Sequence, residues 1–539
     1  MNRQRMLTAL QTAHQPWDLI IIAGGATCLR SALEAATRGL RVALLEAHDF
    51  AKGTSSRSTK LIHGGVRYLR QGQINMVRQS LHERGRLRRN APHIVTSRKF
   101  VIPSYQLAGR LYYYLGMKAY DLLAGPLGFE ASRLLSTAQT ISALPTIKSQ
   151  GLRGGVAYAD GQFDDARLAI ALAQTAVDQG AVLLNYAPVV RLLRRDGRMA
   201  GVVVRDVESQ SEFEVSGRVV VNATGVFGEA IMELDDGDVT GPEASLERPQ
   251  IVASQGTHIV LPREFLPGNS AMLIPHTDDA RVLFAIPWQG RTLFGTTDHR
   301  VETIALEPRP MASEIDYLLE HAGRFLTQRP ERADILSVFA GLRPLVGQSR
   351  AAKGSAAPAT SKLSREHEIH TSPSGLITII GGKWTTYRKM GEDVVDLAQC
   401  VGHLRCGPSR TAHWMLRGAP ANASHAHWES TTEDPLAVYG TERPKLLDLA
   451  ERERSWSALL SPHLPFIGAQ VAWAVEQEMA RTVEDVLARR LRALLLDARS
   501  SLQAAEQTAS IMQSLLNQTA TWRTQQVDAY SKLVGNYLP

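Results

Sequence analysis

The sequence predicts an α/β protein followed by a separate helical domain. Short apolar strands alternate with helical segments over residues 18–400, and no repeat period accompanies them. From about residue 467 the strand pattern gives way to apolar positions at helical spacing. The chain has 539 residues, 44% hydrophobic and 21% charged, which is ordinary for a folded protein of two to four domains. A disordered, collagen-like or coiled-coil chain is therefore excluded.

The first predicted unit is a strand, a turn and a helix followed by a second strand. Residues 18–23 form a short apolar run that is typical of a strand buried on both faces. Gly24 and Gly25 interrupt the run, and residues 29–38 are rich in helix formers and end at a glycine. Residues 41–45 form the next strand. Such a βαβ unit builds a parallel sheet.

Further strands and helices alternate along the chain. Strands are predicted at 181–185, 201–205, 218–222, 257–261, 282–286, 292–295 and 376–380, helices at 73–89, 164–179, 312–328 and 386–399, and loops at 232–249 and 351–362. This order predicts an α/β core with a mixed-sheet insertion.

Composition divides the chain into three parts. Residues 17–403 carry the α/β pattern, and residues 404–434 form a linker rich in Pro, Ala, Ser and His. Residues 435–539 form the helical domain, in which Thr482 and Asp485 have the spacing of a capping box.

Charge and cysteine content restrict the class of protein. Sixty basic and 53 acidic side chains give a net charge of +7, which favours acidic small molecules or an anionic membrane surface over a nucleic acid. Three cysteines without a C-x-x-C pair predict neither a disulfide framework nor a zinc site, and no metal site is expected. A reducing, cytoplasmic compartment is the simplest interpretation. The first seventeen residues contain no apolar h-region, so we expect no signal peptide, and no apolar run is long enough to span a membrane.

The turn after the first strand is where a βαβ unit binds a dinucleotide. The usual G-x-G-x-x-G fingerprint is reduced to its middle glycine, Gly25, because Ala23 and Cys28 occupy the first and third positions. Glu46 ends the second strand, where a carboxylate accepts hydrogen bonds from a ribose diol. A solvated surface charge is the alternative for Glu46, and the fingerprint alone is weak.

A segment rich in hydroxyl groups and glycine follows. Residues 53–69, GTSSRSTKLIHGGVRYL, combine five Ser or Thr with three Gly, two Arg, one Lys and one His. Hydroxyls and glycine amides cradle phosphate groups, and Lys and Arg supply the countercharge. A polar surface loop is the alternative, but the apolar residues within the segment indicate that it passes under the core.

With these features the chain resembles the FAD-dependent glycerol-3-phosphate dehydrogenase family. Motifs of that family recur in order as GQFDDARL at 161–168, NATG at 222–225, SQGTHIVL at 254–261, FAIPW at 284–288, GTTD at 295–298, GLRPL at 341–345, LSREH at 363–367, GGKWTTYRKM at 381–390 and ARRLRALLLDAR at 488–499. The resemblance covers residues 17–400 and part of the tail. It implies a Rossmann-like FAD-binding domain interleaved with a mixed-sheet substrate domain, as in the amino-acid oxidases.

The resemblance also implies a reaction and its partners. The substrate is sn-glycerol 3-phosphate, which is oxidised to dihydroxyacetone phosphate by hydride transfer from C2 to flavin N5, and the electrons pass to a membrane quinone in glycerol catabolism and respiration. An oxidase that uses O₂ is the nearest alternative. The protein would lie on the inner face of the cytoplasmic membrane, with residues 106–129 as the contact, although an aromatic stripe is more often core. A homodimer is one alternative for the assembly.

Each site residue has a role that the resemblance implies. Arg67, Tyr68 and Arg343 contact the phosphate or hydroxyls of the substrate, with a helix cap or an ion pair as the alternative for Arg343. His258 accepts the hydroxyl proton, unless it is a core histidine, and Lys383 stabilises the alkoxide or the reduced flavin. FAD is held by Gly24, Gly25, Glu46, Thr54, Ser55, Ser56, Ser58, Lys60, His63, Thr224, Gly225, Gly382 and Thr385, and His63 is also the second candidate for the base.

Two departures from the family pattern put FAD binding in question. If residue 23 has a positive φ, alanine costs about 1–2 kcal/mol there. Cys28 adds a side chain where helix and strand nearly touch, and overpacking costs roughly 1–3 kcal/mol. Either FAD binds with reduced affinity, or the chain is a decayed, flavin-poor paralogue without activity.

Overall fold

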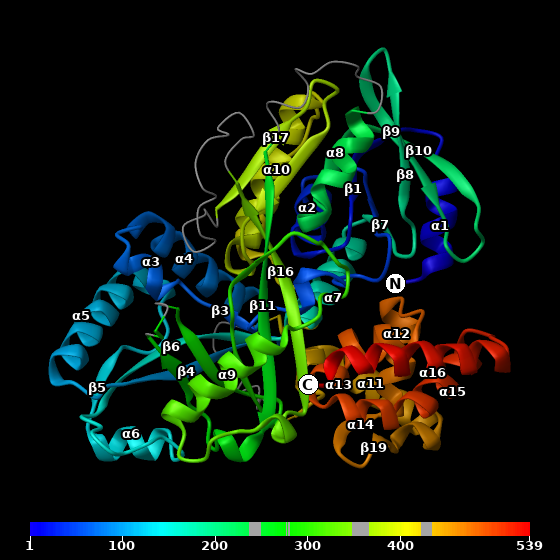
Figure 1. Ribbon diagram of the computed structural model, residues 1–539. Coiled ribbons are helices and arrows are strands. Elements are labelled where there is room, and N and C mark those ends of the chain that lie inside the picture. Colours follow the sequence, from blue (N-terminus) through cyan, green and yellow to red (C-terminus); the bar gives the residue numbers. More distant parts are fainter. Residues whose placement is uncertain (237–248, 276, 279–280, 348–365, 422–433) are drawn as a thin grey trace.

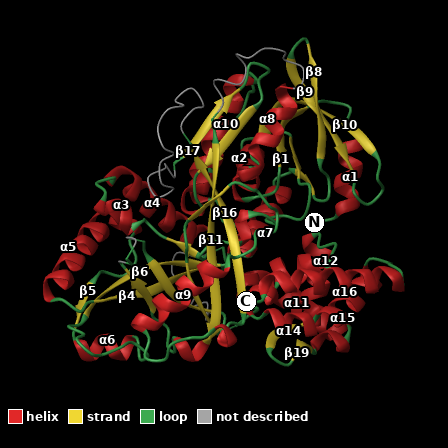
Figure 2. Cartoon of the chain, viewed as in Figure 1, coloured by secondary structure: helices red, strands yellow, loops and turns green. Residues whose placement is uncertain are grey.

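The computed structural model describes residues 1–236, 249–275, 277–278, 281–347, 366–421 and 434–539, except for the side chains of Arg67 and Arg70. Two large sheets and a helical C-terminal region make up the fold (Figure 1, Figure 2). Most of the loop predicted at 232–249 and all of that at 351–362 lie outside the described residues. The loop prediction is wrong for residues 232–236, because they belong to α8 (Gly228–Asp236).

The first sheet is built on the predicted βαβ unit. Its strand order is β17-β18-β10-β1-β2-β7, with β8 and β9 continuing from β10. β18, β10, β1, β2 and β7 run parallel, whereas β17 is antiparallel to β18. The bounds are β1 Trp17–Ile22, β2 Val42–Leu45, β7 Val182–Leu184, β8 Val189–Arg195, β9 Arg198–Arg205, β10 Glu212–Asn222, β17 His367–Thr371 and β18 Ile377–Gly381.

Both faces of this sheet are covered. Leu19 and Ile21 of β1 pack against α2 (Ala26–Thr37), α7 (Asp165–Asp178) and α10 (Tyr387–Val401). Their neighbours Ile20 and Ile22 belong to the opposite cluster, with α1 (Arg3–Gln11), β8 and β9. A strand that alternates between two apolar layers must be apolar at every position, which is why β1 is an unbroken apolar run.

The second sheet carries the other wall of the site. Its order is β15-β11-β14-β13-β12-β4-β6-β3, with β16 on β11 and β5 on β6. Its bounds are β3 Leu61–Ile62, β4 Val95–Pro103, β5 Arg133–Leu135, β6 Gly155–Phe163, β11 Ile251–Pro262, β12 Ala271–Ile274, β13 Leu283–Trp288, β14 Arg291–Gly295, β15 His299–Val301 and β16 Ser337–Val346. The accompanying helices are α3 Val66–Arg70, α4 Ile74–Asn90, α5 Leu107–Ala124, α6 Thr137–Ala143 and α9 Ala312–Phe325.

The C-terminal region is helical, as predicted, apart from a hairpin formed by β19 and β20. Its bounds are α11 Arg443–Arg452, β19 Leu459–Ser461, β20 Leu464–Ile467, α12 Gly468–Glu478, α13 Ala493–Leu496, α14 Ala498–Gln503, α15 Ala505–Leu515 and α16 Ala520–Val534. The capping box is confirmed, because the Asp485 N–H donates to Thr482 Oγ1 at 3.1 Å and the Thr482 N–H to Asp485 Oδ2 at 3.0 Å. The turn that follows, Asp485–Arg490, is π-helical.

The described part of the expected linker packs against helices that accompany both sheets. The Thr411 hydroxyl contacts Glu34 of α2, and the Leu416 N–H donates to the Asn90 carbonyl at 2.9 Å. The Arg417 N–H donates to Thr175 Oγ1 at 3.0 Å. In Figure 1 the C-terminal helices lie beside the ends of β11 and β16. None of the helices in the described ranges is long and apolar enough to span a bilayer.

Candidate active site

A cavity of about 860 Å³ is lined from two sides, by segments that follow strands of the first sheet and by strands of the second. Because β1, β2, β10 and β18 run parallel, the segments after them meet at one edge of the sheet. The opposite wall comes from β11 and β16. The volume is near the upper limit for small-molecule sites, which suits a large cofactor together with a small substrate.

One end of the cavity is formed by the N-terminus of α2. Gly25 is the N-cap residue and provides no side-chain cap, and the Ala26 N–H donates to Ser55 Oγ at 2.9 Å. A Cβ on Gly25 would lie 3.1 Å from that same oxygen, so a side chain there would crowd the loop. The partial positive charge of a helix N-terminus favours phosphate. This geometry supports the role predicted for Gly25.

Glu46 lies at the same end, directly after β2. Its carboxylate accepts hydrogen bonds from the Gly24 N–H and, at 2.7 Å, from the His48 N–H, and the residue lines the cavity. Burial of the carboxylate raises its pKa to about 7. Gly24 itself does not line the cavity, because its amide is turned to Glu46. Glu46 is thus not a solvated surface charge.

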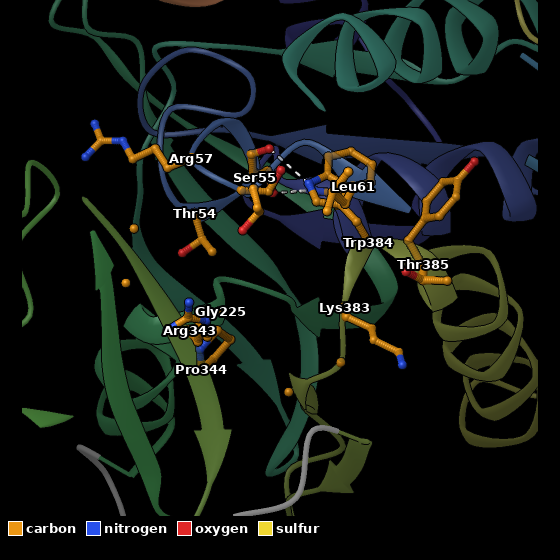
Figure 3. Close-up of a pocket in the computed structure, with 18 of the residues that line it drawn as sticks. Thr54, Ser55, Arg57, Leu61, Gly225, Arg343, Pro344, Lys383, Trp384 and Thr385 are labelled. Atoms are coloured by element: carbon orange, nitrogen blue, oxygen red, sulfur yellow. Dashed lines mark hydrogen bonds between the residues drawn. The ribbon is translucent and has the colours of Figure 1, made fainter. Parts of the chain in front are cut away.

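The hydroxyl-rich loop contributes only some of the residues that we expected. Thr54 and Ser55 line the cavity (Figure 3). Ser58 lines it as well, whereas Ser56 and Lys60 do not. The Lys60 ammonium is fully buried and donates to Asp165 Oδ2 at 2.7 Å and to the Ser56 carbonyl at 2.9 Å. Lys60 therefore neutralises a carboxylate behind the loop, and the prediction of direct cofactor contact is corrected for Ser56 and Lys60.

The register of β11 and β16 brings His258 and Arg343 to one face of the second sheet. Ser254 pairs with Arg343 and His258 with Phe339, and alternate residues of β11 share a face. Gly256 lies between them, and a Cβ there would be 2.3 Å from Arg343 Nη2. The guanidinium therefore occupies the space that the glycine leaves, toward His258.

Arg343 is held by backbone and side-chain groups of the 296–298 turn. Both terminal nitrogens donate to the Thr297 carbonyl at 3.3 Å, and Nη2 also donates to Thr296 Oγ1 at 3.3 Å. Asp298 Oδ1 lies 3.9 Å from Arg343 Nη1, so the two side chains form an ion pair. The side chain is 24% exposed and lines the cavity, which leaves the guanidinium within reach of an anion.

His258 is held in a defined orientation. Its ring stacks on Phe339 at a centroid distance of 4.9 Å, and Nε2 lies 2.9 Å from Thr59 Oγ1. A Cβ on Gly295 would lie 2.3 Å from the ring, so the glycine makes room for it. Burial, followed by the charges of Lys60 and Arg343, lowers the pKa of His258 well below 6.5. Burial and the two neighbouring charges therefore favour the neutral form of the imidazole.

The remaining predicted residues approach the cavity from the end of β18 and from the 63–68 turn. Lys383 Nζ lies 5.0 Å from the centre of the Tyr68 ring, and both residues line the cavity. Thr385 donates from its hydroxyl to the His63 carbonyl at 3.3 Å. His63, Thr224, Gly225, Gly382 and Thr385, for which we predicted contact with FAD, all line the cavity. Arg67 is in α3, but its side chain lies outside the described residues.

Three contributors were missed by the sequence analysis. Thr59 holds His258, and Trp384 Nε1 donates to the Ser55 carbonyl at 2.9 Å (Figure 3). Glu314 of α9 is buried and accepts from Thr297 Oγ1 at 2.6 Å and from Thr257 Oγ1 at 2.7 Å, which fixes the turn around Arg343. Each lies within or next to a quoted motif except Glu314, whose contacts depend on tertiary packing. Within the described ranges no group of His, Cys, Asp and Glu side chains is placed to hold a metal ion.

The two departures from the fingerprint have different consequences. Ala23 has a φ of +96°, so the condition for backbone strain at this residue is met. Cys28 is fully buried, and its thiol lies 3.1 Å from the Ala223 carbonyl, within reach of a weak hydrogen bond. Burial raises the pKa of the thiol to about 12, so Cys28 stays protonated as a small core residue. The strain therefore lies at Ala23.

Fold and site together define an oxidoreductase that binds a flavin dinucleotide. Residues 18–388 match the family model described as FAD dependent oxidoreductase, and residues 407–524 match the model described as C-terminal domain of alpha-glycerophosphate oxidase.

The chain is also similar over its length to a narrower group. It is 37% identical to glycerol-3-phosphate dehydrogenase, mitochondrial, of Rattus norvegicus, over 97% of this chain and 73% of that protein. It is 36% identical to the Saccharomyces cerevisiae enzyme of the same name, over 95% of this chain and 88% of that protein. The chain belongs to the family of FAD-dependent glycerol-3-phosphate dehydrogenases.

Solved structures agree with this assignment. The glycerol-3-phosphate dehydrogenase of Bacillus halodurans, complexed with FAD, superposes with a TM-score of 0.78 at 28% identity, covering 100% of this chain and 98% of that one. The L-alpha-glycerophosphate oxidase of Mycoplasma pneumoniae shares the fold, with a TM-score of 0.55 at 16% identity over 75% of this chain and 99% of that one.

Proposed function

We propose that this chain oxidises sn-glycerol 3-phosphate to dihydroxyacetone phosphate with FAD as cofactor. One observation carries the proposal. A single cavity joins a helix N-terminus and a buried carboxylate, which suit a dinucleotide, to an imidazole and two cationic side chains, which suit a phosphorylated alcohol.

The residues at the first end fit FAD. The side-chain-free N-cap Gly25 and the hydroxyls of Thr54, Ser55 and Ser58 would hold the pyrophosphate, and Glu46 would accept hydrogen bonds from the ribose. Thr224, Gly225, His63, Gly382 and Thr385 would line the remaining length of the cofactor. FAD, when bound, supplies the acceptor of the hydride that leaves C2 of the substrate.

The substrate would be bound by its negative charges and hydroxyls. Arg343 offers a planar fork that matches a phosphate or an alkoxide, and Lys383 offers a point charge above the Tyr68 ring. Arg67, next to Tyr68, is a further candidate for the phosphate. Each charge-assisted hydrogen bond contributes about 1.5–3 kcal/mol. Such an arrangement favours a phosphorylated polyol over glycerol.

His258 would accept the proton of the C2 hydroxyl. Thr59 and Phe339 fix the plane of the ring, so Nε2, which lies beside the cavity-lining Thr59, keeps a constant direction. The guanidinium of Arg343 lies toward His258 and would stabilise the negative charge that develops on the substrate oxygen. His63 is the second candidate for the base.

The electron acceptor would be a quinone, as part of glycerol catabolism and respiration. The exposed face of α5 supports this choice, because Leu111 and Leu115 are 55% and 59% exposed and Leu115 and Tyr112 also line the cavity. An apolar acceptor could therefore reach the cavity along this helix. We propose that α5 also contacts the inner face of the cytoplasmic membrane.

A liposome flotation assay tests the membrane contact. Vesicles of neutral and anionic phospholipid should carry the wild-type protein upward, whereas Leu111→Glu with Leu115→Glu should remain below. Leu502→Glu, at an exposed leucine of the C-terminal region, is the control. Equal flotation of all three proteins would exclude α5 as the contact.

An oxidase is the second candidate function, because the C-terminal match is to a domain named after alpha-glycerophosphate oxidase. Assays of quinone reduction and of hydrogen peroxide release under air separate the two candidates. Rapid peroxide release with no quinone reduction would favour the oxidase.

Anaerobic addition of substrate tests the proposed function. The purified protein should be yellow, and glycerol 3-phosphate should bleach the flavin band whereas glycerol should not. A colourless protein that stays inactive after FAD is added would favour the decayed paralogue instead.

A further inference from the structure

The loop of residues 49–60 is held from behind by the C-terminal region. None of the described residues beyond Met390 lines the cavity, yet the segment 484–492 contacts this loop at several points. We propose that Arg490 and Arg492 are positioning residues for the FAD site, because they fix the loop whose hydroxyls and amides face the cofactor. The proposal rests on the binding of FAD in this cavity.

The first contact is a buried carboxylate that receives two guanidinium groups. Arg490 donates to Asp49 in a fork, Nη1 to Oδ2 at 2.7 Å and Nη2 to Oδ1 at 2.8 Å, and Arg489 Nε donates to Oδ2 as well. Burial alone would raise the pKa of Asp49, but the charges of Arg490 and Arg489 lower it to about 2. Asp49 follows Glu46 by three residues, so the fork fixes the bend that presents the ribose-binding carboxylate.

The second contact lies under the hydroxyl groups of the loop. Arg492 Nη2 donates to the Ser56 carbonyl and, at 3.1 Å, to Asp165 Oδ1. The other oxygen of Asp165 accepts from the Ser58 hydroxyl at 2.7 Å and from Lys60. Ser55, next to Ser56, accepts the Ala26 N–H at the start of α2. Arg492 thus completes a buried cluster behind the part of the loop that meets the phosphate-binding helix.

The backbone of the C-terminal segment departs from regular helix where these arginines occur. Residues 485–490 form a π-helical turn, and both Arg489 and Arg490 reach Asp49 from it. Arg492 has a φ of +68°, an unfavourable conformation for a side chain of this size. Buried ion pairs contribute little net stability compared with apolar packing, whereas their geometric requirements are strict. The strained backbone places three guanidinium groups against one loop. The role of these arginines is therefore to hold the loop in position.

A second interdomain pair provides a control. Arg481, which follows α12, donates to Glu208 in the turn between β9 and β10, through bonds of 2.6 and 3.0 Å. This fork joins the C-terminal region to the first sheet and does not touch the 49–60 loop. Arg167 is not a suitable control, because its partner Glu478 also accepts from Arg490 at 2.9 Å. Removal of the Arg481 fork should weaken docking of the C-terminal region without displacing the cofactor loop.

Flavin affinity of the apoprotein tests the proposal. FAD is titrated into Arg490→Met, Arg492→Met and Arg481→Met, with binding followed by flavin fluorescence and unfolding of each apoprotein followed separately. We expect the Kd for FAD to rise at least about tenfold for the first two variants and to change less than about twofold for Arg481→Met. The Kd of Arg490→Lys, which keeps the charge and loses the fork, should lie between those of wild type and Arg490→Met. Equal Kd values in all variants, or an equal rise in Arg481→Met, would overturn the proposal.

Hydrogen exchange on the wild-type protein provides a second test that needs no variant. Binding free energies are reciprocal, so FAD should slow exchange in residues 484–492 as well as in residues 49–60. Protection confined to the loop would contradict the proposal. Flavin absorbance of the same sample shows separately whether FAD is bound, so failure of this inference is distinguishable from failure of the proposed function.

Discussion

The two ends of the cavity are constructed in different ways. The nucleotide end consists of backbone amides, hydroxyls and the Glu46 carboxylate, and most of it comes from one continuous stretch, residues 25–63. The substrate end consists of an imidazole and cations that are brought together by the pairing of β11 with β16 and by the end of β18. In the proposed function, the first end would bind the cofactor with residues placed by local structure, and the second would perform the chemistry with residues placed by long-range register. Substitutions at the substrate end should therefore leave the Kd for FAD unchanged, and substitutions at the nucleotide end should leave the KM for glycerol 3-phosphate unchanged.

The largest effect is expected at the substrate end. His258→Asn removes the proton acceptor and should lower kcat by about 10²–10⁴ while the Kd for FAD stays the same. Steady-state assays with an artificial electron acceptor measure kcat, and fluorescence titration measures the Kd. His321→Asn, at a buried histidine outside the cavity, should behave as wild type. A kcat near wild type in His258→Asn would show that another group accepts the proton.

Arg343→Lys should mainly raise KM. A point charge replaces a fork, and loss of one charge-assisted hydrogen bond corresponds to a rise of roughly 10- to 100-fold. Initial rates over a range of glycerol 3-phosphate concentrations measure the change, with Arg332→Lys as a surface control. An unchanged KM would remove Arg343 from the substrate site.

The nucleotide end should respond in the opposite manner. Glu46→Gln keeps the shape of the side chain but weakens its acceptance of ribose hydrogen bonds, so the Kd for FAD should rise about tenfold. KM for glycerol 3-phosphate should remain unchanged once FAD is saturating. A shift in KM under those conditions would mean that the two ends are coupled.

Glu46 also predicts a pH dependence of stability in the FAD-free protein. Its pKa is raised to about 7 in the folded state, so the folded state binds an extra proton between pH of about 4.3 and 7. The contribution of protonated Glu46 to the free energy of unfolding is fully present below that pH range and is lost as the pH rises through 7. We expect wild type to lose about 1–2 kcal/mol relative to Glu46→Gln between pH of about 5 and 8, after allowance for exposure to the cavity. Denaturant unfolding at each pH measures the free energy of unfolding of both proteins. If the two free energies changed with pH in the same way, the raised pKa of Glu46 would be contradicted.

The smallest effect is expected at the strained residue of the fingerprint. Ala23→Gly removes the cost of a positive φ and should stabilise the protein by about 1 kcal/mol. Chemical unfolding of both proteins at one pH measures this difference. A loss of stability would mean that the backbone at this position is not strained by the alanine.

The placement of residues at the nucleotide end could be predicted because the sequence pattern is local. An unbroken apolar strand, a glycine turn and a carboxylate after the next strand are sufficient to place Gly25 and Glu46 at one edge of a sheet. Gly24, Ser56 and Lys60 do not line the cavity. For Lys60 the reason is that its partner Asp165 is distant in the chain, and no local pattern reveals that pair.

The substrate end could be predicted only through the family's motifs. His258 and Arg343 share a face because Ser254 pairs with Arg343, and such a register has no signature in either strand alone. The strand pattern of β16 was missed for a related reason, since its arginine and proline interrupt the apolar run. The contacts of Arg490 and Arg492 with the 49–60 loop likewise depend on how the C-terminal region docks.

Single-turnover reduction of the bound flavin tests the central claim most directly. The FAD-loaded protein is mixed without oxygen with glycerol 3-phosphate that carries either hydrogen or deuterium at C2, and the loss of flavin absorbance is followed. We predict that the flavin is bleached in one phase whose rate falls several-fold with deuterium, and that glycerol causes no bleaching. Bleaching by both compounds alike, or no bleaching of a flavin-loaded protein, would contradict the account.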